Sequence, residues 1–308
     1  MNADPIESQT QAAVTRSPQN EGGLSIVVPV YNEEGIVTET AFSLTKVAQN
    51  LGSECEVIFV NDGSGDGTAE ALSKVSGIRV ICHANNRGYG AALKTGICAA
   101  KHRWIAITDA DGTYPNQRIP ELLGLAQAQG CDMVVGSRTS ANVHIPLIRR
   151  PAKWLLSALA SYLAGYEIQD LNSGLRVMKK DVVMRFAKIL PDGFSFTTTI
   201  TLAMLTNGNL VEYIPIDYHR RKGKSKIRPI RDTLNFVQLI IRTVLYFNPL
   251  KIFIPLSVLL VISAFLLSFI SWFLTGKIMD TGTGLLLMSA LLVMAIGMLA
   301  DLIDKRIP

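Results

Sequence analysis

The chain has 308 residues, of which 48% are hydrophobic, and it carries a formal net charge of +5 with a mean hydropathy of +0.28. Its length allows one large domain with an appended segment, and its hydropathy is too high for an ordinary soluble protein. Residues 1–22 are polar and contain no apolar core of signal-peptide length, so we expect a disordered tail there.

From residue 24 to about residue 217, apolar strands alternate with helical patterns. Strands are expected at residues 24–30, 56–61, 78–82, 104–108, 132–137 and 210–216, with helices at about 34–51 and 88–100. Apolar strands without polar alternation, separated by helices, indicate a largely parallel sheet buried on both faces. The pattern therefore predicts an α/β domain over residues 23–228, built on a mostly parallel sheet.

Polar loops follow three of these strands. They are residues 28–34 (Val-Pro-Val-Tyr-Asn-Glu-Glu), 60–68 (Val-Asn-Asp-Gly-Ser-Gly-Asp-Gly-Thr) and 108–114 (Thr-Asp-Ala-Asp-Gly-Thr-Tyr). The carboxyl ends of parallel strands meet at one edge of a sheet, where open α/β folds bind ligands. We therefore expect the three loops to converge in space.

The third loop carries Asp109 and Asp111 one residue apart. On an extended segment two such side chains point the same way, and adjacent carboxylates repel unless a cation neutralises them. A hard divalent ion with oxygen ligands would satisfy the pair. Asp111 and Gly112 would also suit a plain turn after a strand, so the pair alone leaves both interpretations open.

Two long apolar segments lie near the C-terminus. Residues 252–274 and 281–300 contain no charged side chain, and each is long enough to cross a hydrocarbon core of about 30 Å as a helix. The short link between them predicts a transmembrane hairpin over residues 249–308. A buried helical hairpin in a soluble core is the alternative, and the uncharged lengths disfavour it.

Positive charge flanks this hairpin. Lys251 precedes the first span, and Lys305 and Arg306 follow the second. The positive-inside rule then predicts a two-span membrane protein whose main domain and both termini are cytoplasmic. The spans also offer a surface through which a homo-oligomer could form.

The three loops together resemble those of the family 2 glycosyltransferases, which have the GT-A nucleotide-sugar fold. The resemblance covers about residues 24–140 and rests on Val-Pro-Val-Tyr-Asn-Glu, Val-Asn-Asp-Gly-Ser and Asp-Ala-Asp-Gly in this order. It implies that Asp109 and Asp111 are catalytic and hold Mg²⁺ or Mn²⁺ on the diphosphate of a nucleotide-sugar donor. The implied donor-binding residues, with Asp62 on the base, are Pro29, Tyr31, Glu33, Asp62 and Gly88.

The second half of the chain resembles a narrower group. The segment Asp170-Leu-Asn-Ser-Gly-Leu-Arg176 is similar to the Asp-x-x-Ser-Gly-x-Arg segment of dolichol-phosphate mannose synthases and their bacterial relatives, whose motif positions here are Asp170, Ser173 and Arg176. Residues 218–226 resemble their Arg-x-x-Gly-x-Ser-Lys loop. The likeness implies a polyprenyl-phosphate glycosyltransferase over about residues 24–274.

This narrower resemblance assigns phosphate ligands. Arg138 and either Arg149 or Arg150 would hold the phosphate of a polyprenyl acceptor, while Arg220 and Lys226 would close over the donor diphosphate. Seven basic residues and no acid occur between positions 220 and 231, just before an expected amphipathic helix at 229–248. This basic run and an apolar segment at 154–163 favour contact with lipid headgroups at the membrane interface, and we expect no nucleic-acid partner.

The implied reaction is a single inverting displacement, in which an ionised polyprenyl phosphate attacks a nucleotide-bound hexose. One departure is Thr113, which stands where the mannose synthases often carry a glutamine-type ligand, so the metal ligands beyond the two aspartates stay open.

A membrane transferase with another glycolipid or polysaccharide acceptor remains an alternative. A dinucleotide-dependent oxidoreductase is disfavoured because the Gly-x-Gly at residues 88–90 lacks the third glycine and does not follow the first strand. A non-catalytic scaffold is disfavoured by the intact aspartate pair.

Overall fold

The computed structural model describes residues 22–138 except 53, residues 168–218 except 194, residues 248–277 and 280–306, and isolated positions at 161, 162, 165, 238, 241, 245 and 246. Four residues of the sequence-based site lie outside this part: Arg149, Arg150, Arg220 and Lys226. The expected N-terminal tail, the segment 154–163 and the helix 229–248 also fall wholly or mostly outside it.

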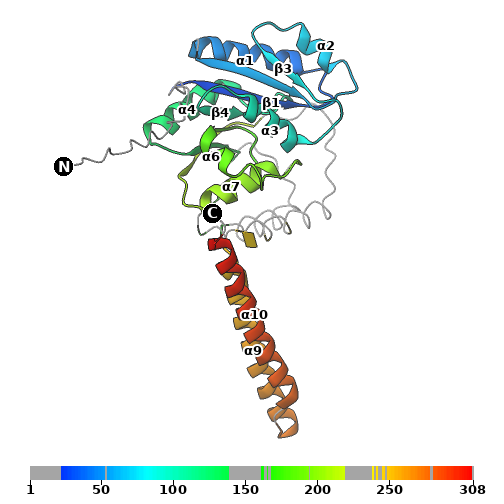
Figure 1. The fold of residues 1–308 in the computed structure, drawn as a ribbon, viewed down its shortest axis with the longest axis vertical. Helices are drawn as coiled ribbons and strands as arrows, with labels where there is room; N and C mark the ends of the chain where they lie inside the picture. Colours follow the sequence, from blue (N-terminus) through cyan, green and yellow to red (C-terminus); the bar gives the residue numbers. More distant parts are fainter. Residues whose placement is uncertain are drawn as a thin grey trace, which may run out of the picture.

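A seven-stranded sheet forms the centre of the domain, in the order β3-β2-β1-β4-β6-β5-β7 (Figure 1). Strand β6 runs antiparallel to β4 and β5, and every other pair is parallel, which confirms the expected mostly parallel sheet. The strands are β1 (Leu24–Val30), β2 (Cys55–Asn61), β3 (Arg79–Cys82), β4 (Trp104–Ile107), β5 (Met133–Ser137), β6 (Arg176–Lys179) and β7 (Val211–Pro215).

Helices cover both faces of this sheet. One buried cluster joins the sheet to α1 and α4 through residues such as Leu44 and Leu122, and another joins it to α3, α6 and α7 through Leu93 and Ile200. Neighbouring residues of β1 enter opposite clusters, as a period-2 strand requires. The helices are α1 (Val37–Leu51), α2 (Thr68–Ser73), α3 (Tyr89–Ala99), the 3-10 turn η1 (Asn116–Arg118), α4 (Ile119–Ala128), α6 (Lys180–Arg185) and α7 (Phe196–Thr206).

Strand β6 is the one described strand that the sequence pattern did not predict, and helices α4, α6 and α7 were not predicted either. Strand β6 has four residues and begins with the fully buried Arg176, which pairs with Ile107 of β4. Because β6 is antiparallel, its first residue lies at the edge where β4 and β5 end. The preceding loop, residues 170–174, is thereby carried to the edge that bears the polar loops.

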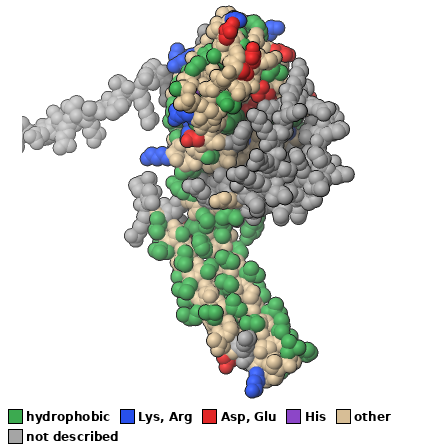
Figure 2. All heavy atoms as spheres, turned by 90° about the vertical axis from the view of Figure 1, so that its right-hand side faces the viewer, with side chains coloured by type: hydrophobic (Ala, Val, Ile, Leu, Met, Phe, Trp, Pro, Cys, Tyr) green, Lys and Arg blue, Asp and Glu red, His purple; other side chains and the backbone are tan. Residues whose placement is uncertain are grey.

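Two long helices leave the domain as a hairpin (Figure 1). Helices α9 (Leu250–Thr275) and α10 (Asp280–Arg306) contain the two predicted spans and extend past both ends of each. Ser257 Oγ donates to the carbonyl of Ala290 at 3.0 Å, and Gly297 lies directly against Phe253, so small residues bring the helices together. Hydrophobic side chains cover the visible outer face (Figure 2), and both helices are long and apolar enough to cross a membrane.

Candidate active site

The loops after β1 and β2 are joined to each other by hydrogen bonds. The backbone N–H of Asn32 donates to Ser64 Oγ at 3.0 Å, and that of Glu33 donates to Thr68 Oγ1 at 3.0 Å. Asn32 has a positive φ of 55°, which asparagine tolerates better than most residues. Because β2, β1 and β4 are adjacent in the sheet, the three polar loops do converge at one edge, as the sequence predicted.

Asp62 ties the end of β2 to the start of α3. Only 3% of the residue is exposed, and its carboxylate accepts the backbone N–H groups of Arg87 and Gly88 at 3.0 and 2.8 Å. Its Oδ1 also lies 2.6 Å from Nδ1 of His83, whose other ring nitrogen lies 2.9 Å from Thr95 Oγ1. Three contacts from the protein thus fix the orientation of this carboxylate.

Pro29, Tyr31 and Gly88, which the resemblance also assigns to the donor, lie at the same edge. Pro29 is buried within β1, beyond the point where pairing with β4 stops, so its missing N–H costs the sheet no bond on that side. Tyr31 follows β1 and is 45% exposed. Gly88 has a φ of 104° and its Cα packs against the carbonyl of Asp192, which leaves no space for a side chain.

The aspartate pair lies just after β4, with Asp109 in the connecting loop and Asp111 in the turn that begins at Ala110. Strand β4 ends at Ile107, two residues before Asp109, so the expected strand 104–108 is one residue shorter in the structure. Asp109 Oδ1 accepts the hydroxyl of Tyr89 at 2.9 Å. Asp111 Oδ1 accepts both the hydroxyl and the N–H of Thr113, at 2.6 and 3.2 Å. Both aspartates are half-buried at the rim.

These two carboxylates fit a divalent cation that is completed by ligands from a substrate. Among the described residues, no group of three or more His, Cys, Asp or Glu side chains forms a metal cluster. Mg²⁺ and Mn²⁺ sites commonly combine one or two carboxylates with water and phosphate oxygens. Asp109 and Asp111 could therefore hold such an ion, while the buried Thr113 orients Asp111.

Tyr89 supports Asp109 from the first residue of α3. Burial raises the pKa of its hydroxyl well above the usual value, and the negative charge of Asp109 raises it further. The phenol therefore stays protonated and remains a hydrogen-bond donor to the carboxylate at any ordinary pH.

The loop before β6 contacts Asp109, the aspartate that Tyr89 supports. A Cβ on Gly174 would lie 2.8 Å from Asp109 Oδ2, so a larger residue at this position would displace the Asp109 carboxylate. The N–H of Gly174 donates to the hydroxyl of Tyr114 at 2.7 Å. Ser173 Oγ donates to the carbonyl of Gly136 at 2.5 Å, which joins the loop to the end of β5.

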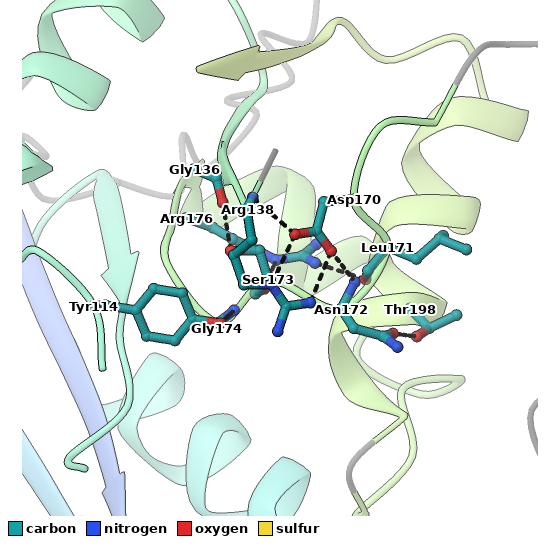
Figure 3. Close-up of polar contacts among 10 residues, drawn as sticks. All are labelled: Tyr114, Gly136, Arg138, Asp170, Leu171, Asn172, Ser173, Gly174, Arg176 and Thr198. Carbon is teal, nitrogen blue, oxygen red and sulfur yellow. Dashed lines mark hydrogen bonds and ion pairs between the residues drawn. The ribbon is translucent and has the colours of Figure 1, made fainter. Parts of the chain in front are cut away.

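Arg138 and Asp170 form an ion pair beside this loop (Figure 3). Nε and Nη2 of Arg138 donate to the two carboxylate oxygens at 2.8 and 2.9 Å, and the backbone N–H of Arg138 donates at 3.0 Å. Burial works to raise the pKa of Asp170, but these hydrogen bonds and the charge of Arg138 outweigh it and lower the pKa. The carboxyl group therefore stays ionised.

Arg176 is fully buried and holds the loop from below. Its guanidinium donates to the carbonyls of Ser173, Leu171 and Thr197 at 2.7, 2.8 and 3.0 Å, and to Thr201 Oγ1 at 2.5 Å. The resemblance grouped Asp170, Ser173 and Arg176 as motif positions, and the structure brings all three into one network.

A family model for glycosyl transferase family 2 matches residues 25–186. The chain belongs to glycosyl transferase family 2. A second family model, the GtrB C-terminal hairpin, matches residues 248–305 of this family 2 glycosyltransferase, which is the region of α9 and α10.

Two relatives and one solved structure illustrate the likeness. Dolichyl-phosphate hexose transferase from Haloferax volcanii is 30% identical over 207 residues, covering 67% of this chain and 87% of that protein. Dodecaprenyl-phosphate galacturonate synthase from Rhizobium johnstonii is 24% identical over 217 residues, covering 69% and 64%. Glucosyl-3-phosphoglycerate synthase from Mycobacterium tuberculosis, crystallised with Mn²⁺, UDP and phosphoglyceric acid, has a TM-score of 0.56 at 19% identity and covers 72% and 78%. This last likeness confirms the predicted GT-A fold.

Three supporting aromatic residues of this glycosyltransferase were not predicted from the sequence. Tyr89 donates to Asp109, Tyr218 lies against the guanidinium of Arg138, and Tyr114 meets Tyr218 edge-on. Each stands in or beside a quoted segment, but a tyrosine there is equally typical of an apolar core. Only the long-range contacts reveal their positions.

Proposed function

We propose that this family 2 glycosyltransferase transfers a hexose from a UDP- or GDP-linked donor to a polyprenyl phosphate, with inversion at the anomeric carbon. The proposal is carried by one juxtaposition, the aspartate pair and Arg138 on one rim of a domain that continues into an apolar hairpin. The names of the Haloferax and Rhizobium relatives support a polyprenyl-phosphate acceptor.

The donor would bind over β1 and β2, with Tyr31 and Glu33 beside the nucleoside and Asp62 beneath it. Asp109 and Asp111 would hold Mg²⁺ or Mn²⁺, and the Mn²⁺- and UDP-bound structural relative supports this expectation. When bound, the ion stabilises the negative charge that builds up on the departing diphosphate. Arg220 and Lys226 would contribute further positive charge to the same phosphates.

The displacement needs no general base. An acceptor phosphate oxygen forms the new bond to the anomeric carbon as the bond to the β-phosphate oxygen breaks, and the electron pair leaves with the nucleoside diphosphate. The nucleophile is already an anion near neutral pH, so no proton has to be removed. Asp62 and Asp170 would not serve as bases in this scheme, because each carboxylate already accepts several hydrogen bonds from the protein. Catalysis then depends on placement and electrostatic stabilisation.

Thr113→Val is expected to raise the Mn²⁺ concentration needed for half-maximal activity about tenfold, because supports of a metal ligand typically contribute 10- to 100-fold in affinity. The hydroxyl that orients Asp111 is lost while the side-chain volume is kept. Binding of Mn²⁺ measured by electron paramagnetic resonance should weaken in parallel. Thr206→Val, which removes a hydroxyl at the far end of α7, should leave both values unchanged. Equal Mn²⁺ affinity in the Thr113 variant and the unmodified protein would show that this contact does not tune the site.

The hairpin would place this reaction at the cytoplasmic face of a membrane. Lys251 lies at the start of α9, and Lys305 and Arg306 lie at the end of α10, so both ends carry the charge that favours the cytoplasmic side. A membrane-impermeant thiol reagent should label a cysteine placed at Lys277, in the link, from outside intact cells. Labelling from the cytoplasmic side instead would reverse the proposed orientation.

The function is tested with the full-length protein in detergent, a panel of radiolabelled UDP- and GDP-sugars, and undecaprenyl or dolichyl phosphate. At least one donor should give a labelled lipid that requires the phosphorylated acceptor. Equal labelling of the unphosphorylated polyprenol, or of a glycolipid or polysaccharide in its place, would support the alternative acceptor and contradict the proposal.

A further inference from the structure

The ion pair with Asp170 determines which part of Arg138 faces outward. A guanidinium carries five N–H groups, and Asp170 accepts one from Nε and one from Nη2. Of the three remaining donors, one on Nη1 and one on Nη2 form the end edge of the guanidinium. Nη1 makes no hydrogen bond to any described residue, and Figure 3 shows it pointing away from Asp170.

An aromatic ring holds one face of the same guanidinium. The Cζ atom of Arg138 lies 5.4 Å from the centroid of the Tyr218 ring, within the range of a cation–π contact. The Tyr114 ring meets Tyr218 edge-on, with centroids 5.3 Å apart and planes at 70°. With one edge on a carboxylate and one face on a ring, the side chain is still 24% exposed.

Asp170 is itself fixed. Its side chain is 6% exposed, and it accepts the backbone N–H groups of Arg138 and Asn172 at 3.0 and 3.1 Å. Arg176 holds the carbonyls of Leu171 and Ser173 in the same loop. The carboxylate is therefore a rigid support whose position does not depend on a bound substrate.

We propose that Asp170 is a positioning residue that, together with Tyr218, presents the Nη1–Nη2 edge of Arg138 to the acceptor phosphate. The inference rests on the proposed function and states how the protein would hold Arg138 in place to bind the acceptor. The planar end edge can donate two parallel hydrogen bonds to phosphate oxygens, and a side chain already held in place loses less conformational freedom on binding. The buried carboxylate also balances the positive charge of Arg138.

The test uses full-length protein with geranyl phosphate, a short and soluble phosphomonoester of the acceptor class. Asp170→Asn should raise the KM for this acceptor about tenfold, the scale expected when one charge-assisted pair is lost, with donor KM and kcat within about twofold. Binding of geranyl phosphate measured by calorimetry should weaken by the same factor. In an Arg138→Ala background, Asp170→Asn should add no further loss, because its effect passes through Arg138.

Asp132→Asn is the matched control. Asp132 is a part-buried aspartate beside β5 that pairs with Lys179 at 2.8 Å, at the end of that strand opposite Arg138. Removing its charge should leave acceptor KM unchanged.

If Asp170→Asn does not fold, Tyr218→Leu tests the positioning of Arg138 in its place. This variant keeps the ion pair, removes the ring, and should raise acceptor KM about threefold, the scale of a partly exposed cation–π contact.

Three results would overturn the inference: losses from Arg138→Ala and Asp170→Asn that add, a rise in donor KM in place of acceptor KM, or no binding of geranyl phosphate by the unmodified protein. Failure of the proposed function looks different. In that case the unmodified protein would transfer no sugar to any polyprenyl phosphate. Calorimetric binding of geranyl phosphate to the same variants would still show whether Asp170 positions Arg138.

Discussion

Asp111→Asn is expected to lower kcat by about a thousandfold, the scale reported for loss of a main electrostatic contact in a transition state. The amide keeps the shape of the side chain but removes the negative charge that would hold a divalent ion. Thr113 should still bind the remaining oxygen, so the turn should keep its conformation. The measurement is single-turnover transfer at saturating donor, with Mn²⁺ binding followed by electron paramagnetic resonance.

The control for this change is Asp181→Asn, which removes an exposed acid of α6 that pairs with Arg185. Its kcat should match that of the unmodified protein. Full activity of the unmodified enzyme in excess EDTA, or unchanged Mn²⁺ binding in Asp111→Asn, would contradict the assignment of this aspartate as a metal ligand.

Arg176→Met is expected to lower the free energy of unfolding by about 3 kcal/mol, because several buried acceptors lose their donor at once. The methionine fills part of the volume but leaves the carbonyls of Ser173, Leu171 and Thr197 without a partner from this side chain. For a domain of this size the loss corresponds to a fall of about 10 °C in the unfolding midpoint. Tryptophan fluorescence during heating of the detergent-solubilised protein measures it.

Arg185→Met provides the comparison. Arg185 is the last residue of α6, the helix that follows β6, and its side chain is 68% exposed and makes a surface ion pair with Asp181. Its midpoint should move by about 1 °C or less. If the two variants melted together, the buried network around Arg176 would contribute nothing to stability.

Much of the fold could be predicted because it depends on local apolar runs. Strand β1 matches its expected bounds because residues 24–30 form an uninterrupted buried run. The loops after β1, β2 and β4 were expected to meet because parallel topology places their ends together, and they do. Helices α9 and α10 are longer than the expected spans, mainly because α9 begins before Lys251 and α10 includes Asp280 and continues past Asp301.

The parts that could not be predicted depend on contacts between distant residues. Strand β6 gives no strand signal because it is short and starts with an arginine, whose burial is made possible by carbonyls contributed from α7 and from its own preceding loop. The partner of Arg138 lies 32 residues away, so spacing could not reveal it. The resemblance could suggest a phosphate ligand at Arg138, but not that Asp170 already accepts two N–H groups of its guanidinium.

The identity of the leaving group tests the proposed displacement most directly. With purified full-length protein, a nucleotide-sugar that proves to be a donor and undecaprenyl phosphate, we expect one nucleoside diphosphate released for each lipid-linked sugar formed. Mass spectrometry of the lipid should then show a single phosphate between the sugar and the polyprenyl chain. Release of a nucleoside monophosphate, with two phosphates retained on the lipid product, would contradict the account, because the bond broken would then lie within the diphosphate and not at the anomeric carbon.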